Sequence, residues 1–266
     1  MYLITRIILL CSLLISQSAF AGSTSRSEII LDPEEIKIFA KNVEKYAASL
    51  GARAFIISRL GQPQSNLPKG IQFTHTAIAI YSKIKLSNGK TVRGYAIHNL
   101  YQDDKIADAS NLVVDYPVDF FWGVYELKTG IIIPTKELQQ RLINTIAKGD
   151  NKALHNPKYS FLSNPYNSKL QNCTEHTLDI INASIYQTTN IQQLKLNARA
   201  HFKRQQVKKS LKLLFGRIFR KDIKTNDHKG KIYTATFTTI NDYLNANNLA
   251  MHSVIYKQGG EITDLY

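Results

Sequence analysis

The fold is decided by residues 73–101, FTHTAIAIYSKIKLSNGKTVRGYAIHNLY. Two apolar runs, residues 73–84 and 91–101, flank the short connection LSNGK. Asn88-Gly89 between two such runs is a strong indication of a β-hairpin, because both residues accept the backbone angles of a tight hairpin turn. The stretch therefore predicts two antiparallel strands at the centre of a sheet.

The rest of the first half of the chain mixes helical and strand-like segments. Apolar residues recur at three- and four-residue steps over residues 33–50, behind the capping residue Asp32, and predict a helix. Further strands are expected at residues 53–59, 120–127 and 130–134, and a helix at residues 135–149. This mixture indicates an α+β fold built on an antiparallel sheet.

A loop over residues 150–171 leads into a second helical region. The sequence NCTEHTLDIINASIY (residues 172–186) has a helical period, with Asn172 as its N-cap, so Cys173 is expected in the first turn. A helix is expected near residues 191–200, and the chain ends with a strand, a short helix and a strand over residues 231–257.

The first 21 residues have the pattern of a cleaved secretory signal peptide. An early cation precedes an apolar run over residues 7–15, which is too short to span a bilayer, and small residues precede Gly22. We therefore expect a periplasmic or secreted protein that begins at Gly22. An N-terminal helix over residues 22–52 would be followed by one α+β domain over residues 53–266.

The chain is basic, with a net charge of +14 that falls to about +13 without the leader, which favours contact with anionic membrane or cell-wall surfaces. Residues 203–224 carry nine cations against one acid, with apolar residues between them, and predict a basic amphipathic helix inserted at about residues 201–224. In the alternative, its apolar stripe packs on the domain and its cations are only solvated. The residues expected at an anionic surface are Lys203, Arg204, Lys208, Lys209, Lys212, Arg217, Arg220 and Lys221.

Cys173 is expected to be the only thiol of the mature protein, because Cys11 lies in the leader. Structural cysteines of exported proteins usually occur in pairs, so a single one is either an inert buried residue or a working thiol. At a helix start, unpaired backbone N–H groups and the positive end of the helix dipole lower the pKa of a thiol. The predicted position therefore favours a working thiol.

A thiol nucleophile usually needs a histidine, and the chain has seven. His75 begins the first strand of the hairpin and His98 lies on the second, and both fall near the end away from the turn. Two imidazoles there would serve as a base and the residue that orients it, as in a catalytic triad. Alternatively, each of the two histidines is an ordinary, half-buried strand residue.

These stretches resemble known enzymes. HTAIAIY (residues 75–81) resembles the His-x-Gly/Ala-Ile strand of NlpC-type papain-like enzymes, and NCTEHTLDII (residues 172–181) resembles their Cys-bearing helix start. The histidine precedes the cysteine here, as in the circularly permuted branch that includes lecithin:retinol acyltransferase. With DYPVDFF (residues 115–121) and NDHKG (residues 226–230), the chain is most similar to a bacterial exported family of unknown function in that branch.

The resemblance implies a papain-like fold of the permuted NlpC type, an antiparallel sheet packed against the Cys-bearing helix. It maps Cys173 as the nucleophile, His75 as the base and His98 as the orienting residue. Asn99 is a candidate third group and Asn172 a supporting residue. A competing, unpermuted order would take His252 or His228 as the base.

The chemistry implied is thiol-dependent hydrolysis or acyl transfer on an amide or ester, such as a cell-wall peptide or a lipid acyl group, through an acyl-enzyme. The alternative is a non-catalytic papain-like binding protein held at an anionic envelope surface. No cofactor or nucleic acid is expected. No metal is expected either, because Cys173 and His176 lack a second ligand pair at a suitable spacing.

Overall fold

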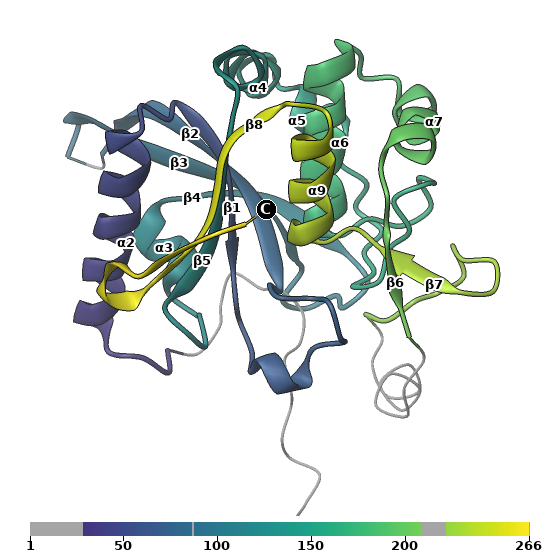
Figure 1. The fold of residues 1–266 in the computed structure, drawn as a ribbon, viewed down its shortest axis with the longest axis horizontal. Coiled ribbons are helices and arrows are strands. Elements are labelled where there is room, and N and C mark those ends of the chain that lie inside the picture. The colour runs from purple at the N-terminus through teal and green to yellow at the C-terminus, as the bar shows by residue number, and fades with distance from the viewer. Residues whose placement is uncertain (1–28, 87, 209–221, 266) are drawn as a thin grey trace, which may run out of the picture.

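The computed structural model describes residues 29–86, 88–208 and 222–265, and the predicted leader lies outside them. A seven-stranded antiparallel sheet in the order β4-β3-β2-β1-β5-β8-β9 forms its centre (Figure 1). Its strands are β1 (Ala54–Arg59), β2 (His75–Lys85), β3 (Thr91–Gln102), β4 (Ser110–Asp115), β5 (Lys128–Pro134), β8 (Ala250–Lys257) and β9 (Ile262–Asp264). A small second sheet pairs β6 (Gln205–Val207) with β7 (Ile232–Thr234). The predicted α+β class is confirmed.

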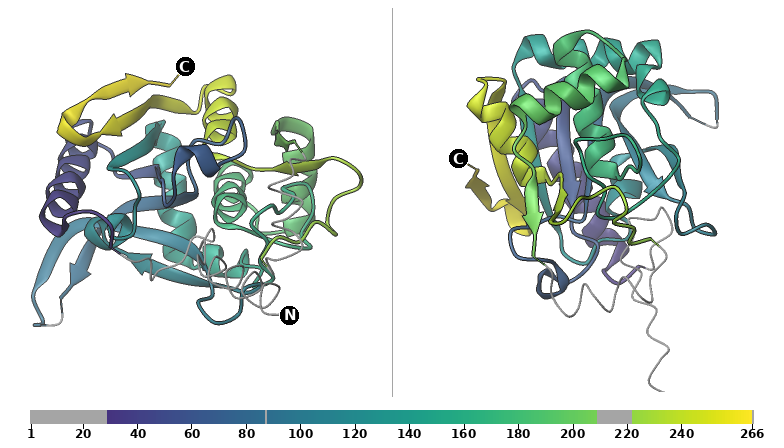
Figure 2. Two further views of the ribbon diagram at one scale, coloured as in Figure 1. Left: turned by 90° about the horizontal axis from the view of Figure 1, so that it is seen from below. Right: turned by 90° about the vertical axis from the view of Figure 1, so that its right-hand side faces the viewer.

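Helices cover both faces of the large sheet (Figure 1). One face carries α2 (Pro33–Ser49) and α3 (Pro117–Phe121), and the C-terminal β8–β9 hairpin lies beside α2 (Figure 2). The other face carries α4 (Lys136–Lys148), α6 (Cys173–Tyr186), α7 (Ile191–His201) and α9 (Phe237–Ala246). Shorter turns of helix are α5 (Asp150–Ala153), η1 (Gln64–Asn66) and η2 (Gln258–Gly260). Among the helices that the structure describes, none is long and apolar enough to cross a membrane.

The predicted helix starts are set by side-chain caps. The Asp32 carboxylate accepts a hydrogen bond from the Glu34 N–H at the start of α2 (3.1 Å), and the Asn172 side chain accepts one from the Glu175 N–H at the start of α6 (2.9 Å). Each cap satisfies a backbone donor that the helix itself leaves unpaired. The cap at Asn172 fixes Cys173 as the first residue of α6.

The β2–β3 register decides which side chains share a face. Ile78 lies opposite His98, and Lys85 lies opposite Thr91. Directly opposed residues point to the same face and neighbours along a strand alternate. Even-numbered positions such as Ile78 therefore face α6 and odd-numbered positions face α2 and α3. His98 consequently points to the α6 face, whereas Asn99 shares the face of His75.

Residues 120–127, which the sequence predicted as a strand, are not one. The chain forms α3 instead, with Pro117 in its first turn and the Asp119 carboxylate accepting a hydrogen bond from the Tyr116 N–H (3.4 Å). Phe120 and Phe121 are fully buried between α2 and the sheet. Their apolar character therefore reflects packing of a short helix rather than a strand.

The predicted basic helix over residues 203–224 is also wrong at its start. Residues 205–207 form β6, whose pairing with β7 replaces helical hydrogen bonds. Lys209, Lys212, Arg217, Arg220 and Lys221 lie outside the described residues.

Candidate active site around Cys173

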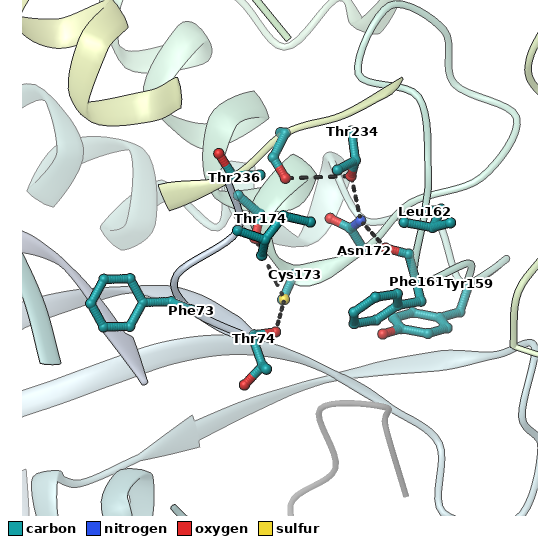
Figure 3. Close-up of a pocket in the computed structure, with 12 residues that line it drawn as sticks. Phe73, Thr74, Tyr159, Phe161, Leu162, Asn172, Cys173, Thr174, Thr234 and Thr236 are labelled. Carbon is teal, nitrogen blue, oxygen red and sulfur yellow. Dashed lines mark hydrogen bonds between the residues drawn. The ribbon is translucent and has the colours of Figure 1, made fainter. Parts of the chain in front are cut away.

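Cys173 is a free, buried thiol in the first turn of α6 (Figure 3). Asn172 caps the helix with its oxygen and donates from its amide to the Phe161 carbonyl (2.9 Å), which ties the helix start to the preceding loop. The expected support from Asn172 is therefore structural: it fixes where the cysteine lies.

The sulfur lies where β2 and β3 separate. The ladder between these strands ends at the pair Ile78 and His98. Closer to the start of β2, the Thr76 N–H donates a hydrogen bond to the Cys173 sulfur. The Thr76 carbonyl accepts a hydrogen bond from the Thr177 hydroxyl (3.2 Å). The first turns of α6 thus take the place of β3 beside Thr76. Arg59 acts on the pKa of both Cys173 and His75, and Cys173 acts on the pKa of Tyr101, so the thiol is electrostatically linked to side chains on the His75 face.

The neighbours of the sulfur flank His75 along the chain. The Thr74 carbonyl oxygen is 4.0 Å from the Cys173 sulfur, and the Thr174 hydroxyl is 3.8 Å away. Figure 3 shows the sulfur between the Thr74 backbone and the start of α6. Residues on both sides of His75 therefore contact the thiol.

A small pocket opens onto the sulfur. Its volume is about 30 Å³, which is enough for one or two water molecules. The lining residues come from the segment before β2, the loop before α6 and the β7–α9 connection; they include Phe73, Thr74, Tyr159, Leu162, Thr234 and Thr236 (Figure 3). This opening offers a route by which a small reacting group can approach the sulfur.

His75 is oriented by Asn99, not by His98. The His75 Nε2 and the Asn99 Oδ1 are 2.8 Å apart, and neither side chain is exposed by more than 2%. The Asn99 amide nitrogen donates to the Ile97 carbonyl (2.9 Å) and to the Asp115 carboxylate (3.1 Å). These bonds fix the amide so that its oxygen faces the ring.

The direction of the Asn99 amide fixes the tautomer of His75. An amide oxygen only accepts hydrogen bonds, so Nε2 must carry the proton of the neutral ring. The lone pair is then on Nδ1, so Nδ1 is the ring nitrogen that can accept a proton. Cys-His-Asn sites of papain-like proteases use the same three residue types.

Three further side chains surround His75. Its ring stacks on Tyr101 (centroids 4.7 Å apart, planes 13° apart), and the Tyr101 hydroxyl donates to Asp115 (2.5 Å). The Arg59 guanidinium lies 5.2 Å from the centres of the Tyr101 and Phe120 rings and donates to the Phe120 carbonyl. Burial, with the positive charge of Arg59, holds the pKa of His75 well below its usual range. The imidazole is therefore neutral at neutral pH, as a base must be.

The thiol does not have the low pKa that a helix start alone predicts. Burial raises the pKa of Cys173, and backbone N–H bonds from Thr76 and Thr174, together with Arg59, only partly oppose that rise. Desolvation therefore outweighs the helix dipole here. The resting site therefore holds a neutral thiol and a neutral imidazole rather than a thiolate–imidazolium pair.

The other predicted histidines have different surroundings. His98 is half-buried on the α6 face of β3, and burial lowers its pKa to about 4. The His252 Nε2 is 2.5 Å from the Tyr46 hydroxyl on α2. The His228 Nε2 donates to the Leu162 carbonyl (2.7 Å), and its Nδ1 accepts from the Tyr233 N–H (3.4 Å). Both ring nitrogens of His228 are thus engaged, which removes it as a base.

Arg59, Tyr101 and Asp115 were missed by sequence reasoning. Tyr101 could have been found from the hairpin alone, because the turn at Asn88-Gly89 fixes which positions face His75. Asp115 ends β4, which has no clear pattern in the sequence. Among the described residues, no three His, Cys, Asp or Glu side chains gather in a way that would hold a metal ion.

Fold and site together define an α+β protein that has a buried thiol at a helix start and a buried, hydrogen-bonded His–Asn pair. The chain belongs to a family described as uncharacterised proteins conserved in bacteria (DUF2145), whose family model matches residues 46–244. This range includes Cys173, His75, Asn99 and Asp115. No curated protein and no solved structure matches the chain.

Proposed function

We propose that this protein is an exported thiol-dependent hydrolase or acyltransferase of the permuted papain-like type, with Cys173 as nucleophile and His75 as base. The observation that carries the proposal is the buried hydrogen bond from His75 to Asn99, in a fold that also places a free thiol at a helix start. An asparagine that sets the tautomer of a buried neutral histidine is suited to proton transfer. Packing of the sheet alone would not require such a pair.

The first step of the reaction is thiol addition to a carbonyl. The Cys173 sulfur forms a bond to the carbonyl carbon of an amide or ester while its proton passes to the His75 Nδ1. The negative charge that develops on the carbonyl oxygen would be stabilised by the Cys173 N–H at the helix start. The imidazolium then returns the proton to the departing amine or alcohol, which leaves a thioester on Cys173.

The second step removes the acyl group. Water, or another hydroxyl or amine, gives up a proton to His75 as it attacks the thioester, and the Cys173 thiol is regenerated. Asn99 holds the ring in one orientation through both steps, and Asp115 in turn holds Asn99. The raised pKa of Cys173 makes this proton transfer necessary in each cycle, because little thiolate is present beforehand.

The sequence also supports a substrate class and a location for this proposal. The resemblance to NlpC-type enzymes supports a cell-wall peptide or a lipid acyl group, and the leader pattern supports action in the periplasm or outside the cell. The proposed acyl transfer uses only protein side chains and water or another acceptor, so it needs no cofactor.

A rival function is binding without turnover. The buried thiol and its raised pKa favour this alternative, because an inert cysteine has the same properties. An activated ester separates the two functions. With p-nitrophenyl acetate, the enzyme should release nitrophenol in a burst and gain one acetyl group on Cys173 by mass spectrometry. Cys173→Ser should show neither, and a wild-type protein that stays unmodified would make the protein a binder.

A further inference from the structure

A second pocket is lined in part by the loop that precedes Cys173. It has a volume of about 520 Å³, far larger than the pocket at the sulfur. It is formed by the loop before α6, the end of α7, the residue before β6 and the turn before β7. The charged residues that line it are Lys169, Arg199, Arg204, Lys229 and Lys231, with Asp227 and His228.

The charge of this pocket is strongly positive. Five cations face one carboxylate, and no ion pair joins any of the five to an acid within the described parts of the chain. Asp227 is buried and already engaged, since it accepts a hydrogen bond from the Asn164 N–H (2.7 Å) and lies 3.1 Å from His228. Its carboxylate therefore helps to hold the loop in place, and Lys169 interacts with it electrostatically without forming an ion pair.

Arg204 is fixed in a position suited to recognition. Its guanidinium lies between the rings of Tyr166 and Tyr233, 4.1 Å and 4.0 Å from their centres, and donates to the Asn164 side chain (2.7 Å). A guanidinium held between two aromatic rings loses little further freedom when it binds an anion. The sequence predicted Arg204 on a basic helix at an anionic surface. Its position between two aromatic rings could not be predicted, because Tyr166 and Tyr233 come together only in the folded protein.

We propose that this pocket binds a phosphate group. A single carboxylate is matched by one arginine, whereas five cations that form no ion pair with any residue that the structure describes suit an oxyanion with more than one negative charge and several acceptor oxygens. The pocket is wide enough for a phosphate with part of the molecule that carries it. The phosphate could belong to a lipid headgroup or to a soluble phosphorylated compound, because the chemistry of recognition is the same.

The pocket also contacts the wall of the candidate active site. The Leu162 carbonyl accepts the hydrogen bond of His228, while Leu162 itself lines the pocket at Cys173. Tyr233 holds Arg204, and the next residue, Thr234, lines the Cys173 pocket. If Cys173 acts as proposed, the phosphate belongs to the substrate whose acyl group it attacks. That link rests on the proposed function, whereas phosphate binding does not.

Titration with inorganic pyrophosphate tests the site directly, since it measures binding without turnover. Calorimetry would compare the wild type, Lys169→Gln/Lys229→Gln/Lys231→Gln, and the control Lys83→Gln/Lys85→Gln/Lys90→Gln on the β2–β3 hairpin. Both variants lose three exposed positive charges. We expect the pocket variant to bind about tenfold more weakly or worse, and the control within about twofold of the wild type at one ionic strength.

Arg204→Lys keeps the charge but loses the planar fork, and should also weaken binding. No binding by the wild type, or equal losses in both triple variants, would overturn the proposal, whatever the acylation of Cys173 shows. Sedimentation with phosphatidylglycerol vesicles identifies the source of the phosphate. Vesicle binding that only the pocket variant loses assigns it to a lipid headgroup, and pocket-dependent pyrophosphate binding without vesicle binding assigns it to a soluble compound.

Discussion

Replacement of Asn99 by alanine should slow acylation of Cys173 while the fold is kept. The change removes the acceptor of the His75 Nε2 proton, a bond of 2.8 Å between fully buried groups. A buried donor left without a partner costs about 1–3 kcal/mol. The ring can avoid this cost by turning or by moving its proton to Nδ1, and either change removes the lone pair that Cys173 needs.

The expected size of the effect follows from that cost. Because about 1.4 kcal/mol corresponds to a factor of ten, acylation by p-nitrophenyl acetate should slow by roughly 10- to 100-fold. His98→Ala is the matched control: it is the next residue on β3 but points to the other face, and its rate should stay within about twofold of the wild type. Thermal unfolding of both variants would show that each is folded. Equal rates for Asn99→Ala and the wild type, or a larger loss in His98→Ala, would refute the assignment of Asn99.

Three further predictions concern the reactivity of the thiol, the loss of folding stability at acid pH and the cleavage of the leader. Alkylation of Cys173 by iodoacetamide without substrate should have its pH midpoint above the ~8.5 of an ordinary thiol, since burial raises the pKa; a midpoint well below that value would show a preformed ion pair. His176 has a folded pKa of about 3 against an ordinary 6.5, so the unfolded chain binds the extra proton and stability is lost as the pH falls below about 6.5. From about pH 7 to pH 5 this residue should cost about 2 kcal/mol in urea unfolding, a loss that His176→Leu should not show; an identical pH dependence in both proteins would contradict it. Exported protein should begin at Gly22 by N-terminal sequencing, and a retained leader would disprove the cleavage site.

Much of the fold could be predicted because its segments obey local rules. The hairpin has its turn sequence, α2 and α6 have their capping residues, and β2 alternates between two buried faces. Where a segment draws its structure from distant partners, the sequence was misleading. Phe120 and Phe121 belong to an apolar run that resembles a strand, but they form part of α3 and pack in the same core as α2. Residues 205–207 form a strand only because they pair with β7.

The residues of the candidate site follow the same rule: those with local sequence signals could be predicted, and properties that depend on the folded chain could not. Cys173 and His75 could be identified because their positions at a helix start and a strand start are local properties. Asn99 was only a secondary candidate because the comparison with other enzymes favoured a histidine at His98, although side-chain alternation excludes that residue from the face of His75. The raised pKa of Cys173 could not be predicted, since it depends on how completely the folded chain excludes water from the sulfur.

The central claim is that His75 takes the proton of Cys173, and the acylation rate of the His75→Asn variant tests it most directly. The variant keeps a polar side chain but has no nitrogen that can accept a proton. Mass spectrometry of Cys173 after mixing with p-nitrophenyl acetate at about pH 7 would give both rates. Loss of a general base predicts acylation slower by about a hundredfold or more. A variant that is folded and acylated as fast as the wild type would contradict the account.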